Sequence, residues 1–148
     1  MTSMTGSMSG RSFLDTNVIV YAADENPSDR AKHDIAVELL ASDPPSLVVS
    51  TQVLQEFYHV VTRKLAKPLD ARRAAAAVRA LTKLAVVGSS AELVLAAIGT
   101  SQSAQISIWD AVIIEAAREA GCERVLTEDL SDGQVIRGIR VQNPFRQA

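Results

Sequence analysis

Short apolar runs alternate along the chain with longer segments in which apolar residues recur every three or four positions. Apolar runs of this length, rich in β-branched residues and bounded by polar ones, predict strands. The predicted strands are residues 12–15, 47–49, 85–87, 124–127 and 139–142. The helical periodicity, with capping residues in front of it, predicts helices. These cover residues 16–23, 28–42, 50–66, 70–84, 90–100 and 108–120.

This alternation of strands and helices predicts the fold class. A helix between two strands of one sheet forms a right-handed crossover, which makes the strands parallel, and successive crossovers place helices on both faces. We therefore expect an α/β fold over residues 12–148: a single domain with a short-stranded parallel sheet between two helix layers (three-layer α/β/α). The length of 148 residues fits one domain. Residues 1–11 are expected to be a disordered leader, residues left from cloning, or the product of a misassigned start.

Composition and charge narrow the function classes. Fifteen Lys and Arg residues against seventeen Asp and Glu residues give a net charge of −2, so the strong basicity of many nucleic-acid binders is missing. The few aromatic residues argue against a sheet that holds RNA by stacking several bases. A single cysteine, Cys122, excludes an internal disulfide and fits a reducing cytosol. No targeting segment is evident and the apolar runs are too short to span a bilayer, so we expect a cytoplasmic protein without a membrane partner.

Four acidic residues interrupt the apolar pattern: Asp15, Glu56, Asp110 and Asp129. Each borders an apolar strand or shares a helix face with apolar residues. Three of the four fall beyond strand ends or in the helix that follows, where ligands gather in a parallel sheet. We therefore expect the four carboxylates to converge on one cleft. Taken singly, each also has a structural interpretation: Asp15 and Asp129 as caps, Asp110 as the capping-box partner of Ser107, and Glu56 as a solvated helix residue.

The residue types at this cleft indicate a hard cation. Carboxylates without a His or Cys cluster favour Mg²⁺ or Mn²⁺ over zinc. One or two such ions lower the pKa of bound water, polarise a phosphate oxygen and stabilise the leaving oxygen. Without a cation, the crowded carboxylates repel one another and their pKa values rise. We therefore expect metal-dependent hydrolysis of a phosphodiester, with packing or surface roles for His33 and His59.

Five short stretches carry a resemblance to a known family. They are FLDTNV (13–18), QEFY (55–58), IWDAVI (108–113), LTED (126–129) and VQNPF (141–145). Their order and separations resemble PIN-domain proteins, and more narrowly the VapC toxin ribonucleases of type II toxin–antitoxin pairs. The likeness covers residues 12–145, nearly the whole chain.

The resemblance implies roles for individual residues. Asp15, Glu56, Asp110 and Asp129 would form the acidic quartet that holds the metal, and Thr16, Asn17 and Thr127 would shape the site. Glu128 and Asp132 crowd the fourth acidic position, and Asp129 is the favoured member. The implied activity is cleavage of single-stranded RNA. The implied partners are a VapB-type antitoxin, whose helix covers the cleft, and a second copy of the chain in a homodimer.

The basic residues that would hold RNA lie near one another in the sequence. Arg63, Lys64 and Lys67, with Arg72, Arg73 and Arg11, form a candidate rim for phosphate contacts, or alternatively a solvated helix face. Trp109 is expected to fill the core, with stacking on a base as the alternative. Asp24, Glu25 and Asp34 are expected to be loop and surface charges.

Other functions remain open at this point. A haloacid-dehalogenase-type phosphatase needs a second acid two positions after the first, where Asn17 stands. A phospho-receiver domain expects a lysine after a late strand, where Glu128 follows Thr127. The remaining alternatives are a PIN nuclease of RNA processing or of DNA, and a non-catalytic PIN-like module that binds RNA or protein.

Overall fold

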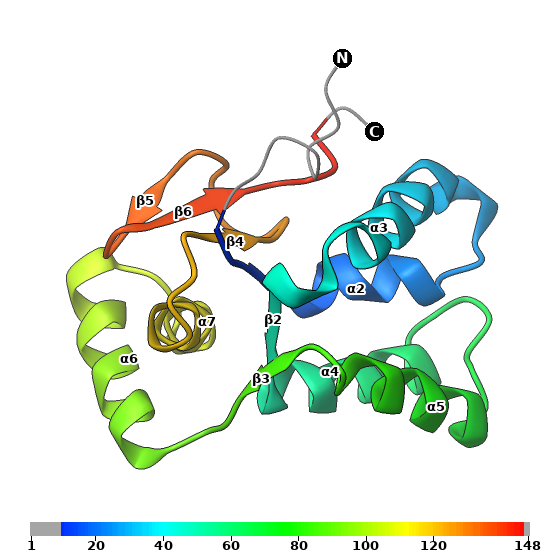
Figure 1. The fold of residues 1–148 in the computed structure, drawn as a ribbon, viewed down its shortest axis with the longest axis horizontal. Coiled ribbons are helices and arrows are strands. Elements are labelled where there is room, and N and C mark those ends of the chain that lie inside the picture. Colours follow the sequence, from blue (N-terminus) through cyan, green and yellow to red (C-terminus); the bar gives the residue numbers. More distant parts are fainter. Residues whose placement is uncertain (1–9, 147–148) are drawn as a thin grey trace.

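The computed structural model describes residues 10–146, in which six strands form one mixed sheet (Figure 1). The strand order across the sheet is β3-β2-β1-β4-β6-β5. The strands are β1 (Ser12–Leu14), β2 (Leu47–Ser50), β3 (Ala85–Val87), β4 (Arg124–Leu126), β5 (Val135–Ile136) and β6 (Ile139–Gln142). All neighbours pair in parallel except β5 and β6, which are antiparallel. The predicted α/β fold is therefore confirmed, with one antiparallel edge strand added.

Helices lie on both sides of the sheet. They are α2 (Thr16–Ala23), α3 (Arg30–Ser42), α4 (Thr51–Arg63), α5 (Ala71–Leu81), α6 (Ala91–Ala104) and α7 (Ile108–Glu119). Helices α6 and α7 pack against each other on one side of β1 and β2, while α2, α3, α4 and α5 lie on the other (Figure 1). Within residues 10–146, no helix combines the length and the hydropathy needed to cross a bilayer.

Side-chain caps begin most of the helices at the predicted positions. Ser50, Asp70 and Ser90 each accept a hydrogen bond from a backbone N–H in the first turn of the helix that follows. Asp15 and Ser107 do the same for α2 and α7. Such caps satisfy N–H groups that have no partner within the helix, so the helix starts could be read from the sequence.

Helix ends differ more from the predictions. Helix α4 ends at Arg63 rather than at residue 66, because the chain turns back and Leu69 N–H donates to the carbonyl of Val61. Helix α6 continues past residue 100 to Ala104, and Gln105 ends it with a φ of 57°. A 3₁₀ turn, Pro27–Asp29, precedes α3, which therefore starts later than residue 28.

Strand β5 was not predicted. It joins β6 through Arg137 and Gly138, whose φ angles of 49° and 82° suit a two-residue hairpin turn. At two residues, β5 is too short to produce an alternating pattern. Residues 1–9 of the predicted leader lie outside the described residues, whereas the Arg11 guanidinium donates to the Ala120 carbonyl.

The central strands and the facing helices form the core. Its largest fully buried side chains include Phe13, Leu14, Ile19, Leu39, Ile114 and Leu126. Because β1 and β4 are parallel neighbours in this core, the residues that follow them lie together at the carboxyl ends of these strands.

Candidate active site

The carboxyl ends of β1 and β4 bring two polar residues together. Leu14 and Leu126 are partners in the parallel register, so the next residues, Asp15 and Thr127, lie side by side. The Thr127 hydroxyl donates to Asp15 Oδ2 over 2.8 Å, and Asp15 N–H donates to the Leu126 carbonyl over 3.1 Å. This pairing fixes the Asp15 carboxylate at the carboxyl ends of the central strands, where ligands bind in parallel folds.

Asp15 is a buried carboxylate, only 7% exposed. Its Oδ1 accepts from the Thr16 N–H over 2.7 Å, which caps α2. The pKa of Asp15 is raised to about 6: burial is the main cause, the hydrogen bonds from Thr127 and Thr16 lower it, and the charges of Asp129 and Glu56 add smaller increases. Among the described residues, its hydrogen-bond partners are all neutral groups.

Asn17 and Thr127 connect Asp15 to the loop after β4. The Asn17 amide nitrogen lies 3.3 Å from Thr127 Oγ1 and 3.5 Å from Asp15 Oδ2, and its oxygen accepts from the Glu128 N–H over 3.3 Å. Asp129 N–H in turn donates to Thr127 Oγ1 over 3.0 Å. The polar residues predicted to shape the site thus bind to the backbone or side chains of its acidic residues.

The other acids approach from separate elements. Helix α7 precedes β4 and runs opposite to it, so its first turn, with Asp110, lies at the carboxyl edge of the sheet. Glu56 is in the second turn of α4, which leaves the sheet after β2. Desolvation raises the pKa of Asp129, and the negative charge of Asp110 raises it further. Together with the effects of Asp129 and Glu56 on Asp15, this links all four predicted acids electrostatically.

A cavity of about 340 Å³ lies at the carboxyl ends of these strands. It is lined by Asp15, Thr16, Asn17, Val20, Tyr21, Asp24, Asp29, Glu56, Val60 and Asp129. Three of the four predicted acids are in this lining, whereas Asp110 is outside it. Asp24, expected as a surface charge, is buried, and its carboxylate accepts from the Asn26 N–H. That expectation was wrong because α2 ends beside the cavity and turns Asp24 inward.

The cavity lining suits a hard divalent cation. Its donors are oxygens, as Mg²⁺ and Mn²⁺ prefer, and a cation would offset the cost of burying the Asp15 charge. Thr16 is part of this lining, and its buried hydroxyl has no hydrogen-bond partner among the described residues. Within residues 10–146, however, no three Asp, Glu, His or Cys side chains are arranged as a preformed cation site. A cation would therefore draw the carboxylates closer together.

The acids that crowd the fourth position differ in their partners. Glu128 Oε2 accepts from Lys32 Nζ over 2.6 Å. Asp132 accepts from the Asn143 N–H and from Arg146, and these bonds lower its pKa. Asp129 has no cationic partner among the described residues. Its carboxylate is therefore the available one of the three.

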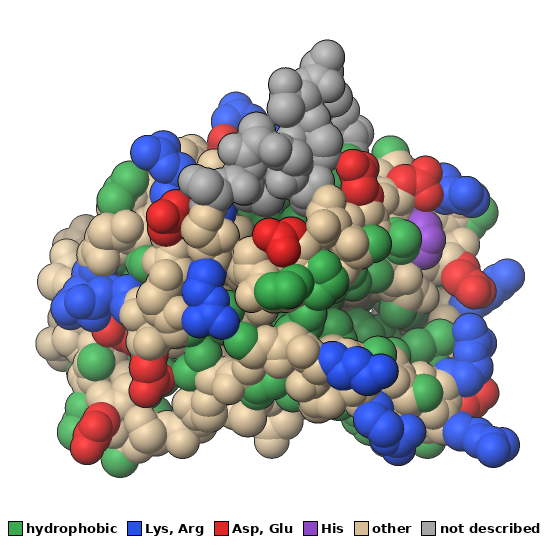
Figure 2. Space-filling model, in the orientation of Figure 1, with side chains coloured by type: hydrophobic (Ala, Val, Ile, Leu, Met, Phe, Trp, Pro, Cys, Tyr) green, Lys and Arg blue, Asp and Glu red, His purple; other side chains and the backbone are tan. Residues whose placement is uncertain are grey.

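A second cavity, of about 490 Å³, lies between α2, α3, α4 and α5, and Figure 2 shows the molecule hollowed between α3 and α5. Its walls are mostly apolar, with Ile19, Phe57 and Leu81 among them. It lacks the grouped carboxylates of the first cavity, so it is not a candidate for phosphodiester chemistry.

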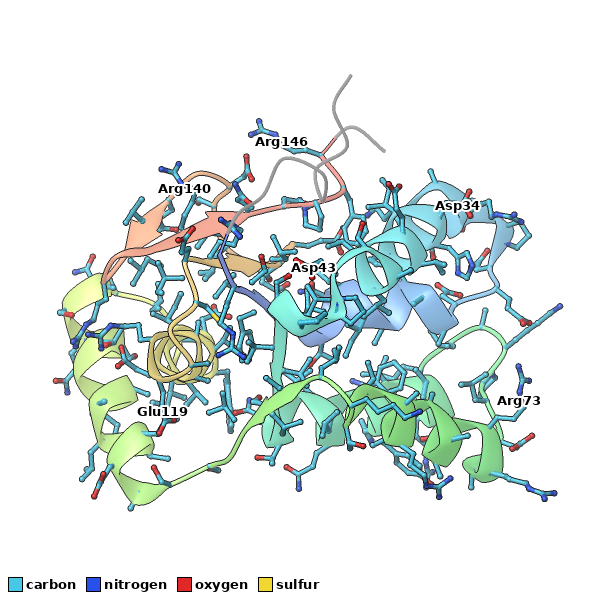
Figure 3. The ribbon with its side chains drawn as sticks, viewed as in Figure 1. Asp34, Asp43, Arg73, Glu119, Arg140 and Arg146 are labelled. Atoms are coloured by element: carbon cyan, nitrogen blue, oxygen red, sulfur yellow. The ribbon has the colours of Figure 1, made fainter. Side chains whose placement is uncertain are left out.

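The predicted basic rim divides into two parts. Arg63, Lys64 and Lys67 are exposed, and Arg63 and Lys64 follow the cavity residue Val60 by three and four positions, on the same side of α4. Basic side chains also gather over α5 in Figure 2, and Arg73 projects from α5 into solvent in Figure 3. Arg11 does not join them, because it precedes β1 and donates to the Ala120 carbonyl at the end of α7, near the amino-terminal ends of the strands.

Trp109 does not fill the core. Its side chain is 68% exposed in the first turn of α7, next to Asp110. The periodicity of this helix places the neighbouring Ala111, Ile113 and Ile114 in the core instead. The less favoured interpretation, an aromatic surface beside the acids, fits this position.

Sequence reasoning missed two polar clusters, one around Glu115 and one that contains Tyr21 and Lys32. Glu115, in α7, is buried and accepts from the Thr100 hydroxyl over 2.7 Å and from Arg118 over 2.8 Å, with Arg137 Nε 3.8 Å away. The signal was present: a glutamate stands between buried residues on both sides in the sequence. Tyr21 and Lys32 were missed as well, since neither residue departs from an ordinary helix pattern.

Comparison with known proteins agrees with this architecture. Residues 12–131 match the PIN domain family, so the chain belongs to that family. No curated protein sequence matches the chain.

Solved structures similar to this chain include a toxin and toxin–antitoxin complexes. The Mycobacterium tuberculosis toxin VapC20, described as cleaving the sarcin–ricin loop, is 24% identical, with a TM-score of 0.60 over 80% of this chain and 89% of its own. A DNA-bound VapBC complex from Salmonella typhimurium is 19% identical, with a TM-score of 0.66 over 92% and 99%. A toxin–antitoxin complex from Klebsiella pneumoniae is also 19% identical, with a TM-score of 0.65 over 90% and 97%.

Proposed function

We propose that this PIN-domain protein is a VapC-type toxin that hydrolyses single-stranded RNA with Mg²⁺ or Mn²⁺. The observation that carries the proposal is the buried Asp15 carboxylate, which has neutral partners and lines a cavity with Glu56 and Asp129. A carboxylate in such surroundings is stabilised by a cation that comes from outside the chain. The likeness to VapC toxins supports the same assignment.

The four acids and their neutral neighbours would have different roles. The cation would be held by Asp15, Glu56 and Asp129, with Asp110 beside them. It would offset the negative charge of the phosphate oxygens and lower the pKa of the attacking water. Thr127 and Asn17 orient Asp15 through its Oδ2. Thr127 also receives the Asp129 N–H, so one hydroxyl fixes both acids relative to each other.

The surroundings of the cavity suit a single-stranded substrate. The exposed Trp109 offers a face on which an unpaired base can stack, and Arg63 and Lys64 lie where the phosphates of a strand leaving the cavity would pass. With a net charge of −2, attraction to RNA would depend on this local basic group and would weaken with salt.

Purified protein incubated with a panel of defined single-stranded RNAs tests the proposal. Cleavage with Mg²⁺ or Mn²⁺, its loss with chelator and its absence in Asp15→Asn are expected. Single-stranded and duplex DNA of the same sequences serve as comparison substrates. Cleavage of DNA alone would replace the assignment with a DNA nuclease, and metal binding without cleavage would favour a non-catalytic PIN module.

The proposed partners are a VapB-type antitoxin and a second copy of the chain. VapBC relatives were crystallised as complexes, which supports the first. Helix α6 exposes Val94, Leu95 and Ile98, apolar side chains that fit pairing with another chain. Light scattering of the pure protein at several concentrations tests for the homodimer, and co-expression with any short reading frame found next to its gene tests for the antitoxin.

A further inference from the structure

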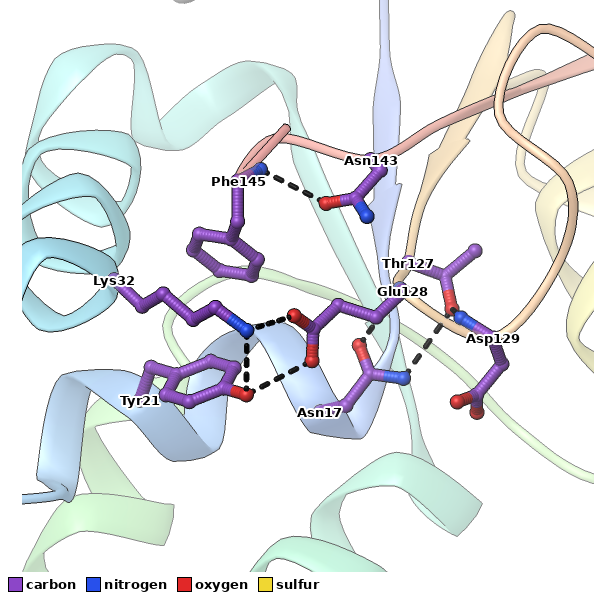
Figure 4. Close-up of polar contacts among 8 residues, drawn as sticks. All are labelled: Asn17, Tyr21, Lys32, Thr127, Glu128, Asp129, Asn143 and Phe145. Carbon is purple, nitrogen blue, oxygen red and sulfur yellow. Dashed lines mark hydrogen bonds and ion pairs between the residues drawn. The ribbon is translucent and has the colours of Figure 1, made fainter. Parts of the chain in front are cut away.

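Glu128 and Asp129 are neighbours in sequence, but their side chains point in opposite directions (Figure 4). Asp129 lines the acidic cavity with Asp15. Glu128 instead accepts from Lys32 Nζ over 2.6 Å and from the Tyr21 hydroxyl over 2.9 Å. Lys32 Nζ also lies 3.3 Å from that hydroxyl, so the three groups form a closed triangle.

Aromatic rings enclose the Lys32 ammonium. Its nitrogen lies 5.0 Å from the centre of the Tyr21 ring and 5.8 Å from that of Phe145. The two rings pack edge to face, 5.0 Å apart, and Phe145 is buried with its N–H bound to Asn143. An exposed ion pair contributes little to stability, but this one has a second hydrogen bond and two ring contacts, which hold Lys32 in one position.

This cluster is close enough to the cavity to influence it. Tyr21, which binds Glu128, is itself part of the cavity lining. The backbone of Glu128 is tied to Asn17, and the next residue, Asp129, is tied to Thr127. A Glu128 carboxylate released from Lys32 would thus remain next to the grouped acids, with one more methylene than Asp129 and no cation to neutralise it.

We propose that Lys32 is a positioning residue: by binding Glu128 on the α2 and α3 side, it leaves Asp129 as the acid of this pair that faces the cavity. This inference rests on the proposed function, because it assigns the ligand set of the same site. Among the described residues, no hydrogen bond or ion pair joins Lys32 to the four predicted acids, so its influence on them would pass through Glu128.

Four proteins test this role: wild type, Lys32→Met, Glu128→Gln and the double variant. Lys32→Met should bind Mn²⁺ several-fold more tightly by calorimetry, because a fifth carboxylate becomes available, and should lose roughly tenfold in kcat with little change in KM. Glu128→Gln should stay close to wild type in both. The double variant should recover kcat, because no competing carboxylate is left.

Arg30→Met is the matched control, since it removes one positive charge from the start of the same helix, where Arg30 pairs with Asp34 in solvent. It should leave Mn²⁺ affinity and kcat unchanged. A double variant as impaired as Lys32→Met would overturn the inference, as would a raised KM in both, which would make Lys32 an RNA ligand. If the wild type cleaves no RNA, the proposed function fails, while unchanged Mn²⁺ affinity in Lys32→Met would separately refute the role of Lys32.

Discussion

Two buried carboxylates of this protein have opposite surroundings. Glu115 lies between α6 and α7 at 5% exposure, where Arg118, Arg137 and the Thr100 hydroxyl surround it. Asp15 lies at the end of β1 at 7% exposure, and its hydrogen-bond partners among the described residues are neutral. The two carboxylates are almost equally buried, so they differ in the charge of the groups that bind them.

The comparison separates a structural acid from the acid that we propose to be functional. Burying a carboxylate is costly unless cations and hydrogen bonds offset the lost hydration. For Glu115 the chain supplies them, and the cluster joins α6, α7 and the β5–β6 turn. For Asp15 the chain supplies hydrogen bonds and further acids, and its raised pKa records the remaining cost. Beyond the cap that it gives α2, the charge of Asp15 would stabilise the fold only with a cation bound.

Activity should give the largest contrast between the two carboxylates. Asp15→Asn should lower kcat for RNA cleavage by roughly 10²–10³-fold, because it removes a charge at the reacting centre while keeping the side-chain shape. Glu115→Gln, the same change at a similar burial, should stay within about twofold of wild type. Initial rates on one RNA at saturating Mg²⁺ measure both. Equal losses in the two variants would remove the distinction.

Asp15→Asn should raise the stability of the protein although it lowers the activity. The pKa of Asp15 is raised from 3.8 to about 6, so the folded state binds the proton more tightly than the unfolded state. The contribution of Asp15 to the free energy of unfolding therefore falls as pH rises from 4 through 6 and levels off above. Without divalent ions, Asp15→Asn should be more stable than wild type at pH 7.5 by at most about 3 kcal/mol, and the gain should vanish near pH 4.

Urea unfolding in chelator at several pH values measures this difference. Asn keeps the acceptor that caps α2, but its amide nitrogen cannot accept from the Thr127 hydroxyl as Oδ2 does, so Thr127→Val in both backgrounds is the control. A variant that is less stable than wild type at pH 7.5 would show that Asp15 is already compensated within the chain.

The strand ends were predictable from the sequence, and this is why Asp15 could be found. A short apolar strand followed by an acid that caps the next helix places that acid at the carboxyl ends of the strands, and the structure has Asp15 there. Helix starts were predictable for the same reason, since capping is local. The end of α4 and the antiparallel β5 were not, because they depend on a long-range turn and on a neighbouring strand.

Partners across the fold could not be predicted. Nothing in the local pattern around Glu128 indicates that Lys32, 96 positions away, binds it, so the sequence alone left Glu128 and Asp129 as competitors. Trp109 was misassigned for a related reason: its hydrophobicity favoured the core, but the rotation of α7 is set by Ala111, Ile113 and Ile114. Which apolar residue stays outside is decided by packing.

Removing Glu115 should test the structural half of the comparison. Glu115→Ala leaves the fully buried Thr100 hydroxyl without its acceptor and leaves two arginines without a counter-charge. Both arginines can turn to solvent, which limits the cost to about 2 kcal/mol of unfolding free energy. Urea unfolding at pH 7.5 measures it. Stability equal to wild type would show that the cluster contributes nothing to the packing of α6 on α7.

Divalent ions should stabilise the protein through Asp15 and not through Glu115. At a free Mg²⁺ concentration of ten times the dissociation constant, binding to the folded state alone adds about 1.4 kcal/mol. Glu115→Ala should keep this increment, because its cluster is on the other side of the sheet, whereas Asp15→Asn should lose most of it. KCl at matched ionic strength is the control for charge screening. An increment that KCl reproduces, or that survives Asp15→Asn, would mean that Mg²⁺ acts on the surface charges and that the Asp15 cavity is not its site.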